Sequence, residues 1–325
     1  MRYKLLGRSG VRVSELCFGT MSFGGDADEE TSAAMFRRCL DAGVNFFDTA
    51  DVYSGGRSEE ILGRLSKALR DDLVITSKFY GPTGPGLNDK GASRRHIQLA
   101  VEGSLRRLQT DRIDVYFIHN FDYDTPLEET LRGLDDLVRA GKILYPAASN
   151  YAAWQVMKAL GLAALHGWAR YECLQPMYNL VKRQAEVEIL PMAQSEGLGV
   201  IPYSPLGGGL LTGKYGREKR PDAGRLTSNA MYQRRYGADA NYDAAEDFTA
   251  LAQELGHDPA SLAVAWVGSH PGVTAPIIGA RNLNQLEGSL NAVNIDMTPE
   301  LRARISALTP APALAHDREE ERKQS

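Results

Sequence analysis

Eight short apolar runs recur along this chain, and stretches with helical spacing lie between them. The runs occupy residues 16–18, 44–47, 73–76, 115–118, 143–147, 171–174, 199–202 and 275–278. Leu105 and Leu108, for example, lie at helical spacing just before the fourth run. Strands that alternate with helices predict a parallel sheet, and eight such strands are the number that closes into a (β/α)8 barrel.

An open, doubly wound sheet is the alternative that this alternation leaves. Its dinucleotide-binding form has a G-x-G-x-x-G turn after the first strand, whereas residues 19–25 have glycines at a different spacing. We therefore predict a single (β/α)8 TIM barrel over residues 1–310, capped at one end by a β-hairpin within residues 2–13. Residues 311–325 are predicted to be a charged C-terminal tail, and no second domain is expected.

Two of the expected connections, residues 79–92 and 207–240, are longer than a barrel needs. Loops of this length in a compact domain are usually functional lids or mobile segments. Because both follow strands, we expect both at the carboxyl-end face of the barrel, where ligands bind in this fold.

The composition excludes several classes of protein. A net charge of −4 without a basic run argues against a nucleic-acid surface. The sequence has no charged-then-apolar leader and no apolar stretch long enough to span a bilayer. Its three cysteines lack metal-ligand spacing, which favours reduced thiols. We expect a cytoplasmic protein that binds no nucleic acid, no membrane and no metal.

Ionisable side chains directly follow three consecutive runs. Asp48 and Tyr53 come after the second run, Lys78 after the third and His119 after the fourth. The carboxyl ends of parallel strands meet at one face, and unpaired buried charges are costly. Four such groups at equivalent positions therefore predict a functional site. The helix that follows Tyr53 is predicted to have Ser58 as its N-cap.

These residue types suit one reaction. A phenol has a pKa near ~10 and is a poor acid at neutral pH. An adjacent ammonium lowers that pKa, and a carboxylate holds the ammonium in place. A neutral histidine can orient a carbonyl oxygen. The set is therefore suited to protonating a carbonyl oxygen while hydride arrives at its carbon, and it offers neither a nucleophile nor a zinc site.

Over nearly its whole length, the chain resembles the aldo-keto reductases. The matching segments are Gly19-Thr20, Asp48-Thr49-Ala50 with Tyr53 and Gly56, Arg57-Ser58-Glu59, Ser77-Lys78, Ile118-His119, Ala148-Ser149-Asn150, Gln175 with Tyr178-Asn179, Tyr203-Ser204-Pro205-Leu206-Gly207, and Ile278-Gly279-Ala280-Arg281 with Gln285-Leu286. Residues 88–97 resemble the branch that contains aryl-alcohol-dehydrogenase-like bacterial enzymes and potassium-channel β subunits.

The resemblance implies the roles of the four ionisable residues. Tyr53 is the general acid, Lys78 and Asp48 tune it, and His119 positions the substrate carbonyl. The reaction implied is the reduction of an aldehyde or ketone to an alcohol.

The resemblance also implies that the cofactor is NADPH (NADP+). Ser149, Asn150 and Gln175 would bond the nicotinamide carboxamide, and Tyr203 would stack on the ring. Ser204, Leu206, Gly207 and Lys214 would lie along the pyrophosphate, and Arg225 would close over the cofactor. Arg281 and Gln285 fall where the family contacts the adenosine 2′-phosphate, for which a guanidinium is the natural partner. The remaining implied contacts are Gly19, Thr20, Met21, Pro205, Gly279 and Ser289.

Two segments depart from the family pattern. Gly288-Ser289 replaces the usual Glu-Asn pair on the adenine side, and residues 145–148 read Tyr-Pro-Ala-Ala where Ile-Gly-Val is more usual. The predicted substrate pocket lies in loops beyond the strand ends and suits an aromatic, terpenoid-like or other bulky carbonyl. Its expected lining is Met21, Phe23, Tyr80, Asn120 and Tyr123.

Other functions remain open. The channel β subunits indicate that this scaffold can serve as an NAD(P)-binding redox-sensing or partner-binding module with little turnover. NAD(P)+-dependent alcohol oxidation is the reverse direction of the same chemistry. A sugar-phosphate isomerase is a further barrel enzyme, but it leaves Tyr203 and the Ser149, Asn150 and Gln175 pattern unexplained. Both a monomer and a homo-oligomer are compatible with the sequence.

Overall fold

The computed structural model describes residues 1–222 and 224–316. Its main sheet has eight parallel strands in the order β10-β3-β4-β5-β6-β7-β8-β9. These are β3 (Cys17–Gly19), β4 (Phe46–Asp48), β5 (Val74–Phe79), β6 (Ile113–Ile118), β7 (Ile143–Ser149), β8 (Cys173–Gln175), β9 (Gly199–Val200) and β10 (Ile277–Ile278). The amides of Thr274 and Ile277 donate to the carbonyls of Val200 and Pro202, which joins the sheet ends into a ring. The predicted barrel is confirmed.

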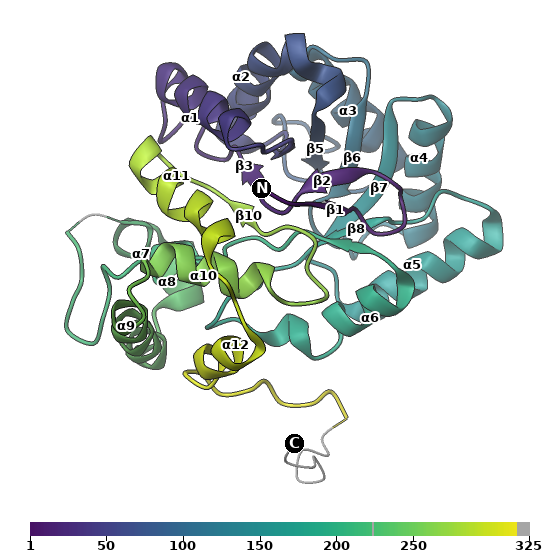
Figure 1. The fold of residues 1–325 in the computed structure, drawn as a ribbon. Coiled ribbons are helices and arrows are strands. Elements are labelled where there is room, and N and C mark those ends of the chain that lie inside the picture. The colour runs from purple at the N-terminus through teal and green to yellow at the C-terminus, as the bar shows by residue number, and fades with distance from the viewer. Residues whose placement is uncertain (223, 317–325) are drawn as a thin grey trace.

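Helices surround this ring on the outside (Figure 1). They are α1 (Glu29–Asp41), α2 (Arg57–Ser66), α3 (Arg94–Leu108), α4 (Leu127–Arg139), α5 (Ala153–His166), α6 (Ile189–Glu196), α9 (Asp239–Glu254), α10 (Pro259–Gly268), α11 (Leu283–Leu290) and α12 (Pro299–Ser306). The long loop before α9 contains the short helices α7 (Arg225–Ser228) and α8 (Ala230–Tyr236). The 3-10 turns are Tyr53–Gly56, Lys67–Asp72, Gln184–Glu186, Gly207–Gly209 and Asn291–Asn294.

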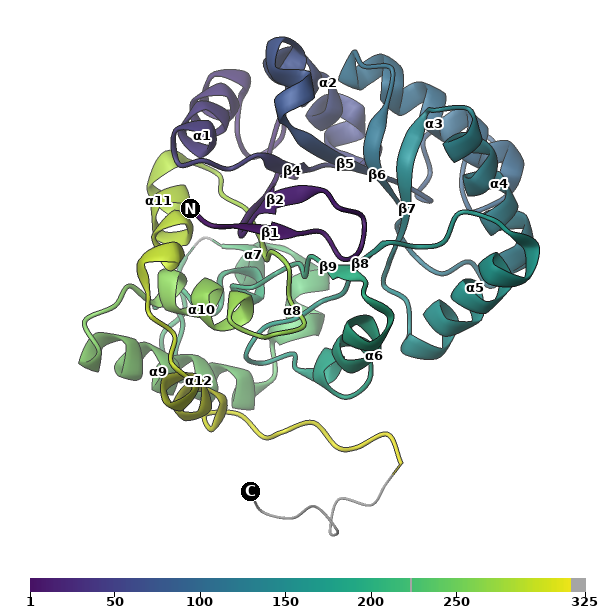
Figure 2. The ribbon, with the colours of Figure 1, turned by 45° about the vertical axis from the view of Figure 1, so that its right-hand side comes forward.

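A β-hairpin closes the amino end of the barrel, as predicted. Its strands, β1 (Tyr3–Leu5) and β2 (Arg12–Ser14), pair antiparallel, and the hairpin lies across the middle of the strand ring in Figure 2. Leu6 and Val13 are fully buried in the apolar cluster that fills the barrel interior. The hairpin therefore leaves the carboxyl-end face for ligands.

Alternation along the strands decides which side chains face the barrel interior. Phe46 belongs to the interior cluster, whereas Phe47 packs outward against the helices. Because successive strand residues point to opposite faces, Asp48 shares the interior face with Phe46. Val74 is likewise interior, and Lys78, four residues further along β5, shares its face. Strand alternation thus places the side chains of Asp48 and Lys78 on the interior face of the barrel.

One predicted helix boundary is wrong. Helix α2 begins at Arg57 after Gly56, whose φ of 93° is a left-handed conformation that glycine adopts easily. Ser58 is therefore not the N-cap but a fully buried residue of the first turn. Its hydroxyl lies within hydrogen-bonding distance of the hydroxyls of Thr20 and Thr49. This tertiary contact outweighs the local capping preference of serine.

Residues 311–316 of the predicted tail form neither helix nor strand, and residues 317–325 lie outside the described part of the chain. Among the described residues, no helix has the length and apolar character needed to cross a membrane.

Candidate active site

A cavity of about 580 Å³ opens at the carboxyl ends of the strands. The 207–240 loop forms one wall, as expected, through residues such as Met231 and Tyr232 of α8. Eighteen predicted site residues line it: Gly19, Met21, Asp48, Tyr53, His119, Asn120, Ser149, Asn150, Gln175, Tyr203, Ser204, Pro205, Leu206, Lys214, Arg225, Gly279, Arg281 and Gln285. The structure therefore brings most of the predicted catalytic and cofactor residues to one cavity.

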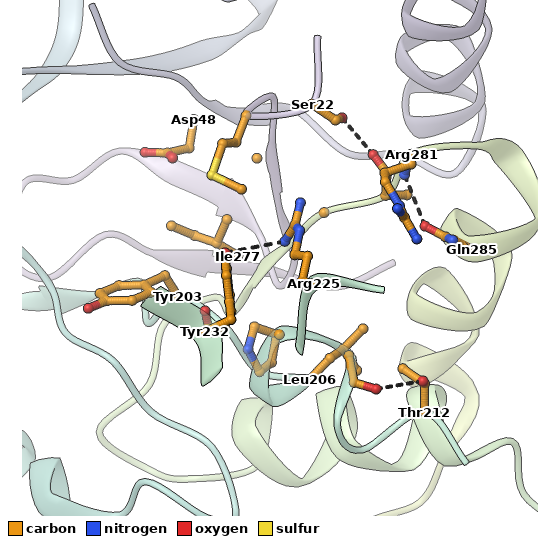
Figure 3. Close-up of a pocket in the computed structure, with 18 of the residues that line it drawn as sticks. Ser22, Asp48, Tyr203, Leu206, Thr212, Arg225, Tyr232, Ile277, Arg281 and Gln285 are labelled. Atoms are coloured by element: carbon orange, nitrogen blue, oxygen red, sulfur yellow. Dashed lines mark hydrogen bonds between the residues drawn. The ribbon is translucent and has the colours of Figure 1, made fainter. Parts of the chain in front are cut away.

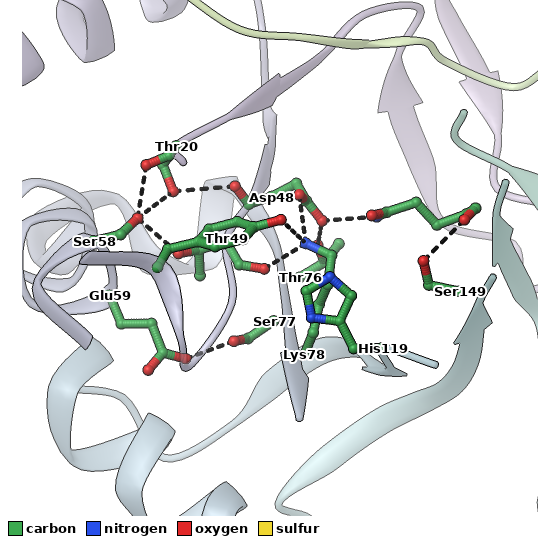
Figure 4. Close-up of polar contacts among 12 residues, drawn as sticks. Thr20, Asp48, Thr49, Ser58, Glu59, Thr76, Ser77, Lys78, His119 and Ser149 are labelled. Atoms are coloured by element: carbon green, nitrogen blue, oxygen red, sulfur yellow. Dashed lines mark hydrogen bonds and ion pairs between the residues drawn. The ribbon is translucent and has the colours of Figure 1, made fainter. Parts of the chain in front are cut away.

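Lys78 is the buried centre of the catalytic group (Figure 4). Its side chain is fully buried, and Nζ donates to Asp48 Oδ2 at 2.6 Å and to the Thr49 carbonyl at 2.7 Å. A third hydrogen bond, 3.3 Å long, reaches the Tyr53 hydroxyl. Burial lowers the pKa of Lys78, but the charge of Asp48 and the Tyr53 hydroxyl outweigh it and raise the pKa overall. The ammonium therefore stays charged beside the phenol.

Asp48 is held by further donors on its other oxygen. Thr76 Oγ1 donates to Asp48 Oδ1 at 2.6 Å, and Gln175 Nε2 donates to the same oxygen at 2.9 Å. Since β5 and β8 supply these donors, three strands fix the carboxylate. Gln175, predicted as a cofactor contact, thus also holds the carboxylate of Asp48 in place.

Burial has the larger effect on the pKa of Tyr53. It raises that pKa, while the charge of Lys78 opposes the rise without reversing it. The expected lowering by the ammonium therefore operates, but desolvation outweighs it. The Tyr53 hydroxyl is protonated at neutral pH, as a proton donor must be.

His119 is neutral in this environment. Burial and the nearby Lys78 charge lower the pKa of its ring to about 3. Its ring meets that of Tyr53 edge-on, with 6.1 Å between the ring centroids. A neutral imidazole beside the phenol can orient a carbonyl oxygen without competing as an acid.

Hydrogen bonds also hold in place the residues predicted to contact the nicotinamide. Tyr203 Oη donates to Asn150 Oδ1 at 2.7 Å, and Asn150 Nδ2 donates to the His119 carbonyl at 2.9 Å. The Ser149 hydroxyl donates to the Gln175 carbonyl at 2.9 Å. Asn150 has a left-handed φ of 58°, so its side chain is held at this position despite backbone strain.

Three further cations line the cavity, and Figure 3 labels two of them, Arg225 and Arg281. Lys214, Arg225 and Arg281 all line it, and none forms an ion pair within residues 1–222 and 224–316. Burial, followed by the charges of Arg281 and Arg225, lowers the pKa of Lys214. Such a group favours a bound anion, because an anion relieves the repulsion among the cations.

Some predicted site residues lie elsewhere. Thr20 is fully buried and donates through Oγ1 to the Asp48 carbonyl at 3.1 Å, so it supports the site from behind. Gly207 is buried within its 3-10 turn. Ser289 is also fully buried, and its hydroxyl has no hydrogen-bond partner in the described structure. None of the three borders the cavity.

The predicted substrate pocket needs a similar correction. Met21 and Asn120 line the cavity, but Phe23 is fully buried in the core, where its ring packs 5.8 Å from that of Phe18. Tyr80 is half-buried outside the cavity, and Tyr123 is 83% exposed. Loop residues next to strand ends need not point inward, because loops lack the alternation that fixes strand side chains.

Several cavity residues were missed by the sequence analysis. They are Ser22, Gly208, Gly209, Thr212, Met231, Tyr232, Arg235, Asp258, Ala260, Ile277, Ala280, Asn284 and Gly288. Met231 and Arg235 lie one turn apart in α8, and that spacing within a loop already predicted to be functional was the available signal.

Comparison with known proteins agrees with this site. The model of the aldo/keto reductase family matches residues 15–309. The oxidoreductase YrpG of Bacillus subtilis is 39% identical, over 96% of this chain and 97% of its own. A probable voltage-gated potassium channel subunit beta of Oryza sativa is 39% identical over 95% of this chain and 96% of its own. Versiconal hemiacetal acetate reductase of Aspergillus parasiticus is 33% identical over 92% of this chain and 94% of its own.

Proposed function

Because the chain belongs to the aldo/keto reductase family and is an oxidoreductase, we propose that it reduces an aldehyde or ketone to an alcohol with NADPH. One observation carries the proposal. The hydrogen-bonded chain from Asp48 through Lys78 to Tyr53 opens into the same cavity as three cations that form no ion pair with any described residue. A proton donor and an anion site thus share one space.

The residues of the cavity fit a phosphorylated dinucleotide. Lys214, Arg225 and Arg281 would hold its phosphates, since a guanidinium can bind two phosphate oxygens at once. At the catalytic end, Ser149 and Asn150 would bond the carboxamide beside Tyr203. When bound, the nicotinamide supplies the hydride that attacks the carbonyl carbon.

The chain itself supplies the proton. His119, which is neutral, donates a hydrogen bond that orients the carbonyl oxygen toward the Tyr53 hydroxyl. Tyr53 protonates this oxygen as negative charge develops on it. Lys78, held by Asp48, stabilises the phenolate that remains. This division explains why Lys78 is buried while Tyr53 borders the cavity.

Cofactor choice provides the test of this proposal. Multiple-turnover oxidation of NADPH with a panel of aromatic aldehydes should proceed faster than oxidation of NADH. Arg281→Ala should raise the KM for NADPH about ten- to hundredfold, the value of a charge-assisted contact, and barely change that for NADH. Equal weakening of both cofactors, or a wild-type preference for NADH, would contradict the role of Arg281.

A second function has an observation in its favour. Two plant relatives carry the name probable voltage-gated potassium channel subunit beta, so a redox-sensing or partner-binding module is the alternative that we retain. Binding of NADPH without repeated turnover on any aldehyde in the panel would favour it. Turnover of an alcohol with NADP+ would instead indicate the oxidative direction.

We also propose a cytoplasmic location. Cys17, Cys39 and Cys173 are free and buried, which suits a compartment in which thiols stay reduced.

A further inference from the structure

Four cations line the cavity. The charges of Arg281 and Arg225 both lower the pKa of Lys214, so these three cations lie near one another. Arg235 also lines the cavity, and its charge acts on the hydroxyl of Tyr203. Burial raises the pKa of that hydroxyl to about 12, and the Arg235 charge is the strongest effect that opposes the rise.

The hydroxyl of Tyr203 marks the catalytic end. It donates to Asn150 at 2.7 Å, and Asn150 in turn bonds the His119 carbonyl at 2.9 Å. Arg235 therefore lies on the side of the cavity where the carbonyl is to be reduced. Met231, one helical turn earlier in α8, lines the same wall.

Arg235 has no acidic partner within residues 1–222 and 224–316. Two carboxylates line the cavity. Asp48 is already engaged by Lys78, Thr76 and Gln175, and Asp258 accepts hydrogen bonds from Ser261. Arg235 is half-buried, and a partly desolvated guanidinium gains from a bound anion. The cofactor phosphates have three other cations to bind them, which leaves Arg235 for the substrate.

We propose that Arg235 binds a carboxylate on the substrate, so that the preferred substrates are aldehydes or ketones that carry an acidic group. The inference rests on the proposed carbonyl reduction and names its substrate class. The planar guanidinium can donate two parallel hydrogen bonds to a carboxylate, which would hold the far end of the substrate while the carbonyl faces Tyr53. The apolar Met231 would contact the carbon frame between them.

A matched pair of aldehydes tests the proposal. 4-Carboxybenzaldehyde carries the acid, and methyl 4-formylbenzoate presents the same aldehyde without the charge. The wild-type enzyme should have the higher kcat/KM for the acid. Arg235→Met should lower kcat/KM for the acid about 10- to 100-fold, as expected for a charge-assisted contact. The change for the ester should stay within about twofold, since the ester makes no such contact.

Two variants serve as controls. Arg234→Met removes the same charge from the exposed neighbouring position and should leave the preference intact, which separates a specific contact from the general field. Arg235→Lys keeps the charge but loses the planar fork, so it should retain part of the preference. Thermal unfolding checks that each variant is folded.

The outcomes separate this inference from the function on which it rests. Equal loss for acid and ester, or a weaker Kd for NADPH in Arg235→Met, would assign Arg235 to pocket shape or to the cofactor and overturn the proposal. Wild-type reduction of the ester without preference for the acid would overturn it while leaving carbonyl reduction intact. Failure to reduce either aldehyde would refute both.

Discussion

The ammonium of Lys78 is buried, and hydrogen bonds to its neighbours offset the energetic cost of burying its charge. A lone charge in this position would be strongly destabilising, but Asp48, the Thr49 carbonyl and the Tyr53 hydroxyl all accept hydrogen bonds from it. The sequence identified this group because Asp48 and Lys78 follow apolar runs, at the carboxyl ends of neighbouring strands. The role of Thr20 was missed because a hydroxyl facing the back of the site gives no periodic signal.

Asp51 provides a prediction at the same scale. It is 3% exposed, and neither carboxylate oxygen has a hydrogen-bond partner in the described structure. Burial, together with the charge of Glu59, raises its pKa to about 7, against the opposing charges of Arg107 and Lys78. In the unfolded chain the ordinary pKa of an aspartate is about 3.9.

The raised pKa implies that Asp51 destabilises the fold as pH rises. Below about pH 4 Asp51 is protonated in both the folded and the unfolded chain, so its raised pKa does not change the free energy of unfolding. Above about pH 7 it is ionised in both, and the raised pKa lowers the free energy of unfolding by about 4 kcal/mol at most. Asp51→Asn should therefore raise the thermal midpoint more at pH 8 than at pH 4.5. Calorimetry at the two pH values measures this difference, and an equal shift at both would contradict it.

At the scale of elements, helix α2 is held close to α3 by a residue without a side chain. A Cβ placed on Gly63 would lie 2.5 Å from the carbonyl carbon and oxygen of Leu108, at the end of α3. The backbone of α3 thus approaches α2 directly. Since α2 follows the turn that carries Tyr53, this contact also supports the position of Tyr53, the proposed general acid.

Alanine at two helical glycines should have opposite effects. Alanine favours a helix over glycine by roughly 1 kcal/mol, and Gly161 in α5 has open space around its Cβ position. Gly161→Ala should therefore stabilise the protein by up to this amount. Gly63→Ala should destabilise it by about 1–3 kcal/mol, because overpacking against backbone outweighs the propensity gain. The two thermal midpoints decide the matter, and stabilisation by both substitutions would refute the close contact.

At the scale of the whole molecule, the barrel brings the proposed proton-donating group and the proposed phosphate-binding cations to one cavity. Strands β4 and β5 supply Asp48 and Lys78, while the loop after β10 supplies Arg281. The strand-borne residues were predictable because each follows an apolar run at the carboxyl end of a strand. The wall formed by α8 was not, because the helical spacing of Met231 and Arg235 does not show which face of this short helix packs toward the cavity.

Catalysis by the Asp48, Lys78 and Tyr53 chain is the central claim, and Tyr53→Phe tests it most directly. The substitution keeps the ring but removes the one hydroxyl that Lys78 contacts in the described structure. Tyr123→Phe, at an exposed position outside the cavity, is the matched control. Turnover of an aromatic aldehyde should be measured together with the Kd for NADPH.

Tyr53→Phe should lower kcat by about 10²–10⁴-fold, the usual contribution of general acid catalysis, while the Kd for NADPH and the activity of Tyr123→Phe stay close to wild type. A deuterium isotope effect with deuterated NADPH establishes that hydride transfer limits the rate. If Tyr53→Phe keeps more than about a tenth of wild-type turnover under that condition, Tyr53 is not the proton donor.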